Sequence, residues 1–447
     1  MTANPPERHD LGDSLALRWA GADDAERVAQ FNAQVFRNAA DDPPDQWALT
    51  QTREYMVLGH PLLAATDFAL VEDTATGAVV ASTCLMRQIW DYDGVAFDVG
   101  RPELVGTDPA YRNRGLVRAL FAALHERSAA RGQPVQAITG IPYFYRQFGY
   151  EYALDVDGGR VAYLDSLPEA KEGEPEAYAL RPATPDDLPF IMALYDRRRA
   201  GLHVSTVIPQ EVWGTAFDQC DPAYRTAWRL LVIVDAAGAT CGYVRVSSRR
   251  GGQFLPVWDF AVREGLSPRT VAPPVLRALR DIAAATPVWQ RERPLRGLAL
   301  LLGREHPLYA ALGPTVLPRD FPPYAWYVRV ADLPAFLRRL APALERRLAA
   351  SPEAGYSGEL KLDFYRDGLR LTFADGRLTD AAPWRRPVWG EDAQAGFPPL
   401  VFLQLLFGYR GLAELRAAYP DVTAEAEGAA LLDILFPQRL SWVPYLE

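Results

Sequence analysis

The chain has 447 residues, of which 49% are hydrophobic, and this length favours two to four globular domains over one. A formal net charge of −9 argues against a nucleic-acid partner, because phosphate contacts need a basic field. The cysteines Cys84, Cys220 and Cys241 lie far apart in the sequence and form no C-x-x-C pair, so neither a disulfide framework nor a zinc site is indicated.

The first 14 residues are polar and contain two adjacent prolines, so we expect residues 1–14 to be a disordered tail. No apolar run follows a basic stretch at this end, which argues against a signal peptide and against a membrane-spanning segment. The expectation is a cytoplasmic protein with no membrane partner.

Predicted elements follow in the order strand, helix, strands. Leu15–Trp19 is predicted to be a strand, and the next segment has apolar residues at helical spacing up to Phe36. Four further strands are predicted, separated by turns: Phe68–Glu72, Val79–Ile89, Val95–Val99 and Leu104–Thr107. This order predicts a mixed α/β fold of the α+β class.

The last of these strands leads through a basic turn into a second helix. The turn is Arg112-Asn113-Arg114-Gly115, and the helix begins at Leu116. A helix start presents unpaired backbone N–H groups and the positive end of the helix dipole, so the turn is suited to a phosphate group. With a single glycine between arginines, it fits neither a Walker loop nor a Rossmann turn.

The spacing Arg112-x-x-Gly115-x-Val117 resembles the acetyl-CoA pyrophosphate loop of the GNAT N-acetyltransferases, although Val117 stands where that family has Gly or Ala. A strand is predicted at Val135–Thr139, and Tyr145–Tyr150 then matches the family's Tyr-x-x-Phe-Gly-Tyr segment. The resemblance implies an acyltransferase that uses acetyl-CoA as a co-substrate and needs no metal.

The resemblance also implies roles for individual residues. Tyr145 would be the general acid, with a packing aromatic as the alternative interpretation, whereas His125 is expected on the solvated face of its helix. Gly140 would lie where two strands separate to admit the pantetheine arm. The remaining acetyl-CoA contacts would come from Val105, Gly106, Thr107, Arg112, Asn113, Arg114, Gly115, Leu116, Val117 and Arg118.

An acidic stretch at residues 167–177 is predicted to be a linker, and the opening of the chain recurs beyond it. The segment Ala16–Asp24 returns 163 positions later as Ala179–Asp187. We therefore expect a catalytic GNAT domain at residues 15–166 and a second, GNAT-like domain at residues 178–328. In the second copy Val271 and Pro274 stand in for Arg112 and Gly115, so no acetyl-CoA binding is expected there.

Residues 329–447 contain a predicted helix, two hairpins and further helices, an order that resembles the sterol carrier protein-like domain of the Eis (enhanced intracellular survival) type of acetyltransferase. In that type the terminal carboxylate is the catalytic base and hexamers are usual. The resemblance therefore implies Glu447 as the base, through its side-chain or its α-carboxylate, and a homo-oligomer. Prolines and apolar residues before Glu447 suggest a docked segment.

The acceptor is less well defined by the sequence. The resemblance places the substrate near Phe36 and Asn38, but Asn38 and Leu446 stand where acidic residues are expected. We expect direct acetyl transfer, in a ternary complex, to a primary amine of a small cationic molecule. Two alternatives remain open: a lipid- or ligand-binding protein that retains affinity for CoA, and a protein-lysine acetyltransferase.

Overall fold

The computed structural model describes residues 8–39, 41–170, 172–218, 227–250, 252–288, 293–387 and 392–446. The chain forms two compact units. The first contains the described residues up to Leu154, together with Leu202–Val207 and Ala325–Ser441. The second contains Asp155–Gly201, Ile208–Tyr324 and the described residues from Trp442 onward.

Among the described residues, the main sheet of the first unit follows the order β1-β2-β3-β4-β5-β6-β16-β7, with β10 paired to the far end of β4. The hydrogen-bonded pairs are antiparallel from β1 to β5, whereas β5 and β6 are parallel. The strands are β1 (His9–Gly12), β2 (Leu15–Trp19), β3 (Phe68–Asp73), β4 (Ala78–Tyr92), β5 (Val95–Thr107), β6 (Val135–Ile138), β7 (Glu151–Val156), β10 (Val204–Val207) and β16 (Tyr324–Val330).

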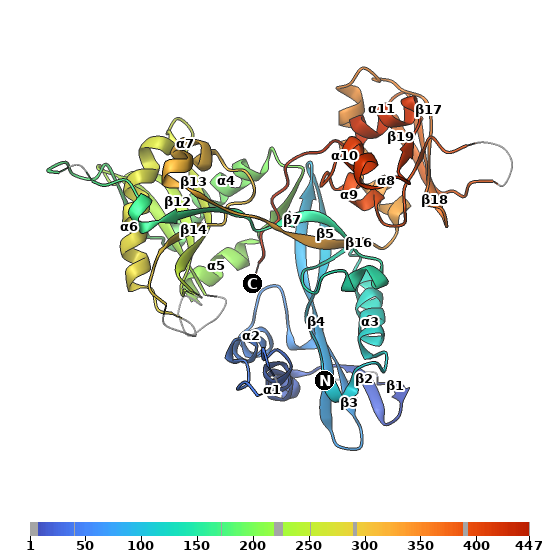
Figure 1. The fold of residues 1–447 in the computed structure, drawn as a ribbon, viewed down its shortest axis with the longest axis horizontal. Helices are drawn as coiled ribbons and strands as arrows, with labels where there is room; N and C mark the ends of the chain where they lie inside the picture. Colours follow the sequence, from blue (N-terminus) through green and yellow to red (C-terminus); the bar gives the residue numbers. More distant parts are fainter. Residues whose placement is uncertain are drawn as a thin grey trace. The chain divides into compact units, whose positions relative to one another are not determined.

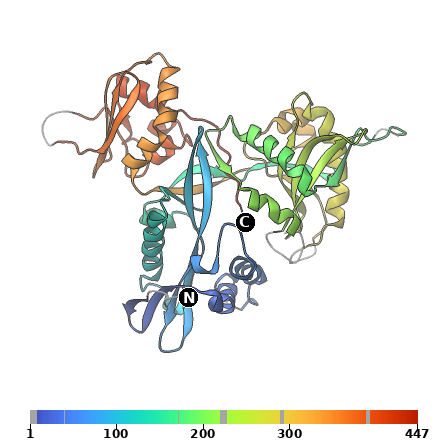
Figure 2. The same cartoon turned by 180° about the vertical axis from the view of Figure 1, so that it is seen from behind.

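Helices cover both faces of this sheet. Helices α1 (Ala25–Val35) and α2 (Gln46–Val57) lie on one face and α3 (Leu116–Ala130) lies on the other, as Figures 1 and 2 show from opposite sides. Short 3₁₀ turns connect the elements: η1 (Ala22–Asp24), η2 (Ala65–Asp67), η3 (Pro109–Tyr111) and η4 (Phe144–Phe148). The arrangement confirms the expected mixed α/β fold.

Part of the N-terminal segment that was expected to be disordered forms a strand. Residues 8–14 lie within the expected disordered tail, yet His9–Gly12 form β1, which pairs with β2 across a tight turn at Asp13 and Ser14.

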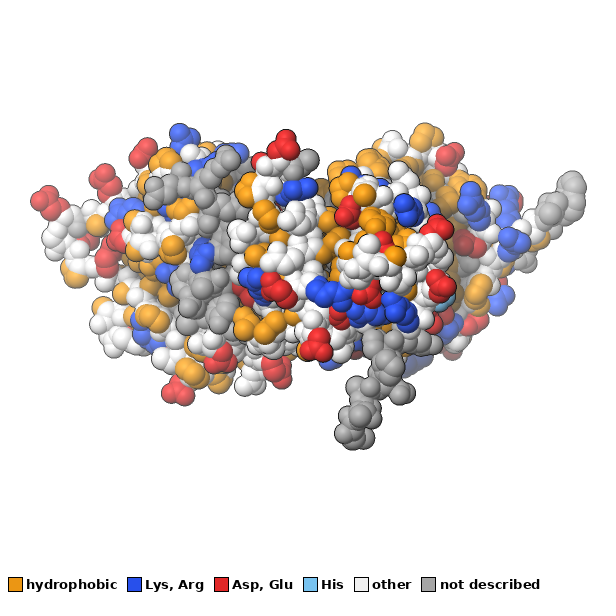
Figure 3. Space-filling model, turned by 90° about the horizontal axis from the view of Figure 1, so that it is seen from below, with side chains coloured by type: hydrophobic (Ala, Val, Ile, Leu, Met, Phe, Trp, Pro, Cys, Tyr) orange, Lys and Arg blue, Asp and Glu red, His pale blue; other side chains and the backbone are white. Residues whose placement is uncertain are grey.

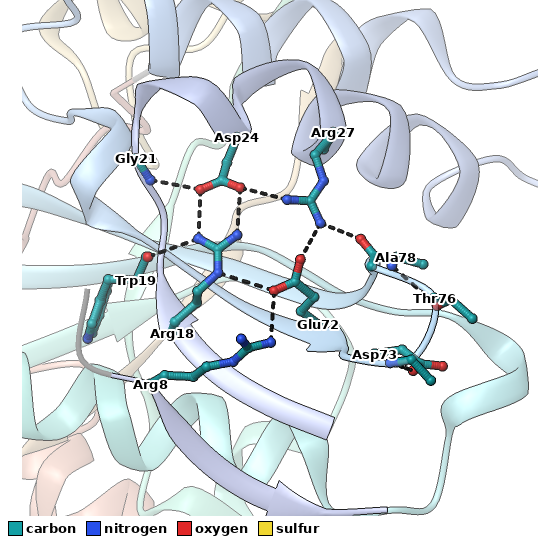
Figure 4. A network of polar contacts seen from close by, with 12 residues as sticks. Arg8, Arg18, Trp19, Gly21, Asp24, Arg27, Glu72, Asp73, Thr76 and Ala78 are labelled. Atoms are coloured by element: carbon teal, nitrogen blue, oxygen red, sulfur yellow. Dashed lines mark hydrogen bonds and ion pairs between the residues drawn. The ribbon is translucent and has the colours of Figure 1, made fainter. Parts of the chain in front are cut away.

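Asp24 caps the turn before α1 by accepting from the Gly21 N–H at 2.9 Å and from both terminal nitrogens of Arg18 at 2.7 Å (Figure 4).

The second unit is built around a seven-stranded sheet within the described residues, in the order β15-β8-β14-β13-β12-β11-β9. Its strands are β8 (Gly159–Tyr163), β9 (Tyr178–Pro182), β11 (Trp228–Asp235), β12 (Thr240–Ser247), β13 (Phe254–Val262), β14 (Gly297–Leu300) and β15 (Arg319–Phe321). Its helices and turns are η5 (Leu164–Ser166), η6 (Pro185–Asp187), α4 (Leu188–Arg199), α5 (Gln210–Asp218), α6 (Pro268–Ala285) and α7 (Pro307–Val316).

The sequence repeat recurs in the side-chain geometry of this unit. Arg181 donates to both carboxylate oxygens of Asp187 at 2.7 and 2.8 Å, and the Thr184 N–H donates to Asp187 at 2.8 Å. Each of these residues lies 163 positions after its counterpart in the Arg18–Asp24 pair. The two copies therefore begin with the same strand, bidentate ion pair and capped turn.

Two strands belong to a different sheet from the one that the predicted domain boundaries imply. Strand β8, within residues 15–166, belongs to the sheet of the second unit, where it pairs with β14 and β15. Strand β16, at the end of residues 178–328, belongs to the first sheet, between β6 and β7. Pairing of such distant segments leaves no signal in local sequence patterns, so this arrangement was not predicted.

The C-terminal part of the first unit forms its own layer of strands and helices. The sheet order is β19-β18-β17-β20-β21, with β17 (Gly358–Asp363), β18 (Gly368–Ala374), β19 (Arg377–Pro383), β20 (Ala395–Gly396) and β21 (Thr423–Ala424). The helices are α8 (Leu333–Ala349), α9 (Phe402–Leu406), α10 (Leu412–Ala418) and α11 (Ala426–Leu435).

A buried polar cluster joins this layer to the turn between β4 and β5. Arg347 of α8 donates to the Asp93 carboxylate at 3.0 Å and lies 3.0 Å from Nδ1 of His203. Arg439 also contacts Asp93, at 3.1 Å. His203 is fully buried, and burial, followed by the charge of Arg347, lowers its pKa to about 3.

Candidate active site

The two parallel strands of the first sheet separate at the predicted acetyl-CoA site. Strand β5 pairs with β6 only at Val99↔Val135 and Gly100↔Gln136, although β5 continues to Thr107. Strand β6 stays paired with β16 along its whole length, so β6 follows β16 and leaves the end of β5. An opening of this kind exposes backbone groups on the facing edge of β5.

A bulge distorts β5 beside this opening. The register with β4 shifts between Cys84↔Glu103 and Ser82↔Gly106, so Leu104 and Val105 together face the single residue Thr83. Leu104 has a φ of +51°, which a leucine rarely adopts. Bulges commonly redirect groups next to active sites, and this one interrupts the regular ladder at the predicted acetyl-binding residues.

The helix that follows begins with an open N-terminus. Gly115 is the N-cap of α3, with a φ of +76°, and no side chain caps the first turn. That turn carries no acidic residue, and a Cβ on Gly115 would meet nothing within 4 Å. The free backbone N–H groups at this start are therefore accessible to an anion.

Three arginines surround this helix start. Arg112, Arg114 and Arg118 are exposed, and in the described part of the chain none of the three forms an ion pair. Arg114 lies over the ring of Tyr111, and Arg118 lies over the ring of Phe148. Unpaired positive charge beside an uncapped helix start is suited to a pyrophosphate group.

The corresponding helix of the second unit is closed to anions. Its N-cap is Ser267, whose hydroxyl accepts from the Arg269 N–H at 3.3 Å, and Pro268 in the first turn has no N–H to offer. Pro274 lies inside this helix, so the predicted correspondence of Pro274 with Gly115 is wrong, and Ser267 takes that place. The start of α6 therefore lacks the uncapped, glycine-started form of the start of α3.

Tyr145 is buried in an aromatic cluster next to the opening. Its ring lies 5.2 to 5.6 Å from those of Phe144, Tyr327 and Phe121. A Cβ on Gly140, whose φ is +130°, would come within 3.5 Å of the Tyr145 hydroxyl. Val105 and Val117 pack against the same cluster. The structure thus brings the proposed acid together with residues from β5, α3 and the segment after β6.

The prediction that His125 lies on the solvated face of its helix is wrong. This residue is half-buried rather than solvated, and its Nε2 shares a 2.9 Å hydrogen bond with the Tyr150 hydroxyl. Burial, with a smaller effect from Arg329, lowers the pKa of His125 to about 4, while burial raises that of Tyr150. The pair is therefore uncharged at neutral pH, and it packs on Phe121 behind Tyr145.

Helix α1 lies against the end of β5. A Cβ on Gly106 would approach Val35 to 3.1 Å, so glycine permits this close contact. The predicted substrate residues follow directly: half-buried Phe36 is the C-cap of α1, and Asn38 is exposed two residues later. Glu447, which the resemblance implies as the base, lies outside the described residues. Leu446, just before it, is buried.

One buried polar atom at the end of β5 has no partner. The Thr107 hydroxyl oxygen is buried without a hydrogen bond, and each such group calls for an explanation. A polar co-substrate bound along this strand end would supply the partner. This orphaned oxygen, the unblocked glycine at position 115 and the unpaired arginines all fit acetyl-CoA.

Other candidate sites are less suited to catalysis. The described residues contain no group of three or more His, Cys, Asp or Glu side chains placed to hold a metal ion. In the C-terminal part of the first unit, a hollow of about 520 Å³ is lined by charged side chains of both signs, among them Arg386, Asp392, Arg416 and Glu425. Burying a lipid chain against such charges is unfavourable.

Known families and proteins match parts of this chain. Residues 16–153 match a family model described as an acetyltransferase (GNAT) domain. Those residues are a GNAT domain. N-acetyltransferase Eis from Mycobacterium tuberculosis is 30% identical over 125 residues, which is 27% of this chain and 31% of that relative. The match thus spans about a third of the relative's length. The matched domain family and this relative belong to the same enzyme class, the acyltransferases.

Solved structures resemble the fold over almost the whole chain. A GCN5-related N-acetyltransferase from Kribbella flavida has a TM-score of 0.63 at 19% identity, covering 96% of this chain and 97% of its own. Eis1 from Mycobacterium abscessus has a TM-score of 0.54 at 16% identity, covering 94% and 97%. At these identities the likeness establishes the fold alone.

The charges on the surface and the hydropathy of the helices are relevant to the kinds of partner that the chain could bind. On the face shown in Figure 3, acidic and basic side chains are interspersed, with hydrophobic ones among them. Within the described ranges, no helix is both long enough and apolar enough to cross a membrane.

Proposed function

We propose that the chain is an acetyl-CoA-dependent N-acetyltransferase that acts on a primary amine of a small cationic molecule by direct transfer in a ternary complex. The observation that carries the proposal is the open, arginine-flanked start of α3 beside the separation of β5 from β6. Bound acetyl-CoA supplies an activated acetyl group. The pyrophosphate would lie on the residues from Arg112 to Arg118, and the backbone of Val105, Gly106 and Thr107 would hold the pantetheine and acetyl groups.

The proposed proton transfers use two residues. Tyr145 gives its hydroxyl proton to the departing thiolate sulfur, a role for which a phenol is suited because its usual pKa lies near 10. A carboxylate of Glu447 accepts a proton from the ammonium group of the substrate, and the free amine attacks the acetyl carbonyl carbon, so that the C–N bond forms and the thioester C–S bond breaks. Glu103, on β5, is a less suitable base. Its carboxylate accepts hydrogen bonds of 2.6 and 2.8 Å from Arg101.

We further propose the domain arrangement of the Eis type, a cytoplasmic location and a homo-oligomer, with a hexamer as the expected form. The domains would be a catalytic GNAT domain at residues 15–166, a GNAT-like domain at 178–328 that does not bind acetyl-CoA, and a sterol carrier protein-like domain at 329–447. The repeated Arg–Asp geometry of residues 18–24 and 181–187 supports the tandem arrangement. The charged lining of the C-terminal hollow favours an enzyme over a lipid-binding module.

The test is the release of CoA from acetyl-CoA with a panel of polyamines, amino sugars and lysine-containing proteins. Turnover with small amines is the expected result. Modification of protein lysines alone would select a protein acetyltransferase, and binding of CoA without turnover would contradict the enzymatic proposal.

A further inference from the structure

Strands β5 and β6 continue past their last contact without a ladder between them. They pair at Val99↔Val135 and Gly100↔Gln136, and both then extend further along the sheet. Facing strand edges tend to pair, because each backbone N–H and C=O group gains a partner when the strands close. The separation therefore needs structural elements that hold it open.

Gln136, in the last paired position, is fixed by a buried polar cluster. Its side chain is completely buried, and its amide nitrogen donates to the Ser128 hydroxyl at 2.8 Å and to the Gln133 carbonyl at 3.1 Å. Its amide oxygen accepts from Arg329 at 2.6 Å. A Cβ on Gly100 would come within 2.7 Å of the Ser128 hydroxyl, so the glycine leaves room for this cluster.

Arg329 belongs to β16, the strand on the other side of β6. It lies directly opposite Gln136 in the register of these two strands. Among the described residues no carboxylate pairs with Arg329, and its guanidinium donates to Gln136 instead. A hydrogen bond from a charged donor is stronger than one between neutral groups. Arg329 therefore holds β6 against β16 at the point where β5 separates.

Tyr327, two residues earlier on β16, holds the turn that follows β6. Its side chain is completely buried, and its hydroxyl donates to the Ile141 carbonyl at 3.3 Å. The same carbonyl accepts from the Phe144 N–H at 3.2 Å, at the start of η4. The centre of the Tyr327 ring lies 3.9 Å from that of Tyr152, in a stack, and 5.5 Å from that of Tyr145. Tyr327 thus contacts both the backbone that leads to Tyr145 and the ring of Tyr145.

We propose that Arg329 and Tyr327 are positioning residues of the active site, the first for the opening that admits acetyl-CoA and the second for the acid Tyr145. The proposal rests on the proposed function, in which acetyl-CoA lies between β5 and β6 and Tyr145 protonates the thiolate. Both side chains come from β16, which lies outside residues 16–153, the part that matches the acetyltransferase domain. The site of this domain would then be completed by a strand from much later in the chain.

The role of Arg329 is tested on the full chain by titration calorimetry with acetyl-CoA. Arg329→Met keeps an unbranched side chain but removes the donor, whereas Arg329→Lys retains a charged donor. A matched control is Arg87→Gln, because Arg87 forms an exposed ion pair with Asp98 elsewhere in the same sheet. Arg329→Gln, which keeps a neutral donor on a shorter side chain, provides a second test if Arg329→Met does not fold.

We expect the Kd of acetyl-CoA to be about tenfold weaker in Arg329→Met and to stay within about twofold of the wild type in Arg329→Lys and Arg87→Gln. Arg329→Gln should lie between these values. Thermal unfolding shows which variants are folded. An unchanged Kd in the folded Arg329→Met and Arg329→Gln variants would overturn the role of Arg329.

The role of Tyr327 is tested by Tyr327→Phe, which removes only the hydroxyl group. Tyr324→Phe is the control, at the exposed start of the same strand. Hydrogen–deuterium exchange should be faster in peptides that contain Phe144 for Tyr327→Phe and unchanged for the control. For Tyr327→Phe we also expect kcat to fall about tenfold while KM for acetyl-CoA stays within about twofold, because the acid is misplaced and the opening is not.

A double variant separates positioning from a general structural effect. Because Tyr327 acts through Tyr145, Tyr327→Phe should cause no further loss of kcat in the Tyr145→Phe background. Equal losses in the two backgrounds, or an unchanged kcat in Tyr327→Phe alone, would refute the positioning role and leave the proposed function standing. If the wild type turns over no amine, the proposed function fails, and the exchange at Phe144 still decides whether Tyr327 holds the turn.

Discussion

The clearest test of the acetyl-CoA site is the pair of variants Gly115→Asp and Gly115→Ala. Gly115 combines a left-handed backbone with open space around its Cβ position and a helix start that carries no acidic side chain. Alanine adds only a methyl group there. Aspartate adds a similar volume and also a negative charge beside the expected position of the pyrophosphate.

The order of the two variants in stability should be the reverse of their order in affinity for acetyl-CoA. A non-glycine residue in the left-handed region costs about 1–2 kcal/mol, so Gly115→Ala should lower stability. Aspartate tolerates this conformation better and regains about 0.3–1 kcal/mol from the helix dipole, so Gly115→Asp should be the more stable of the two. At this exposed site two unit charges about 4 Å apart repel by about 1 kcal/mol, or about 2 kcal/mol for the two charges of a pyrophosphate.

A loss of about 2 kcal/mol corresponds to a roughly thirtyfold weaker Kd. Titration calorimetry with acetyl-CoA should show this loss for Gly115→Asp, a change within about threefold for Gly115→Ala, and one site per chain. Ser267→Asp places the same charge at the start of α6 and should leave the affinity unchanged. Two sites per chain, or an unchanged Kd in Gly115→Asp, would refute the assignment of the site.

Three further predictions address the acid, the base and the buried histidine. Tyr145→Phe keeps the ring contacts and should retain acetyl-CoA binding while kcat falls on the order of a hundredfold; an unchanged kcat at saturating substrates would return Tyr145 to a packing role. Residues added after Glu447 convert its α-carboxylate into an amide and should remove most activity without lowering Tm, with Glu447→Gln doing less; full activity of the tagged chain would exclude that carboxylate. His203 has a pKa of about 3 when folded against an ordinary 6.5, so the unfolded chain binds the proton more readily. Its contribution to stability is therefore complete above pH 6.5 and is lost as the pH falls toward 3, on the order of 2 kcal/mol by pH 5. Urea unfolding at pH 7 and pH 5 measures this loss, His203→Gln should reduce it, and equal stability at the two pH values would contradict it.

Features set by short stretches of sequence could be predicted. The strand Leu15–Trp19 has the bounds expected from its pattern. The repeat found in the sequence reappears as matching ion pairs, because Arg18 at the end of β2 and Asp24 of η1 lie only six residues apart. The helix start at Gly115 was also visible, since a single glycine in an arginine-rich turn before an apolar helical pattern is a local signal.

Features that depend on distant segments could not be predicted. The placement of β16 beside β6 joins residues far apart in the chain, and no periodicity encodes which strand fills that position. The bulge at Leu104 arises from its register with β4, and the burial of His125 depends on Tyr150 folding back over α3. The start of α6 was misplaced because Pro274 was matched with Gly115, although the helix begins at Pro268.

The two copies of the fold share the features that shape the backbone. They differ at the helix start where acetyl-CoA binding is proposed for the first copy. Both retain the Arg–Asp pair of the first turn, the parallel strands and the bulge, all of which shape the backbone. Only the first retains an uncapped helix start, because Ser267 caps the corresponding helix of the second copy. Because the backbone arrangement is shared, the fold alone cannot account for the unpaired arginines beside Gly115. Binding of an anionic co-substrate accounts for them, and each copy can serve as the internal control for the other.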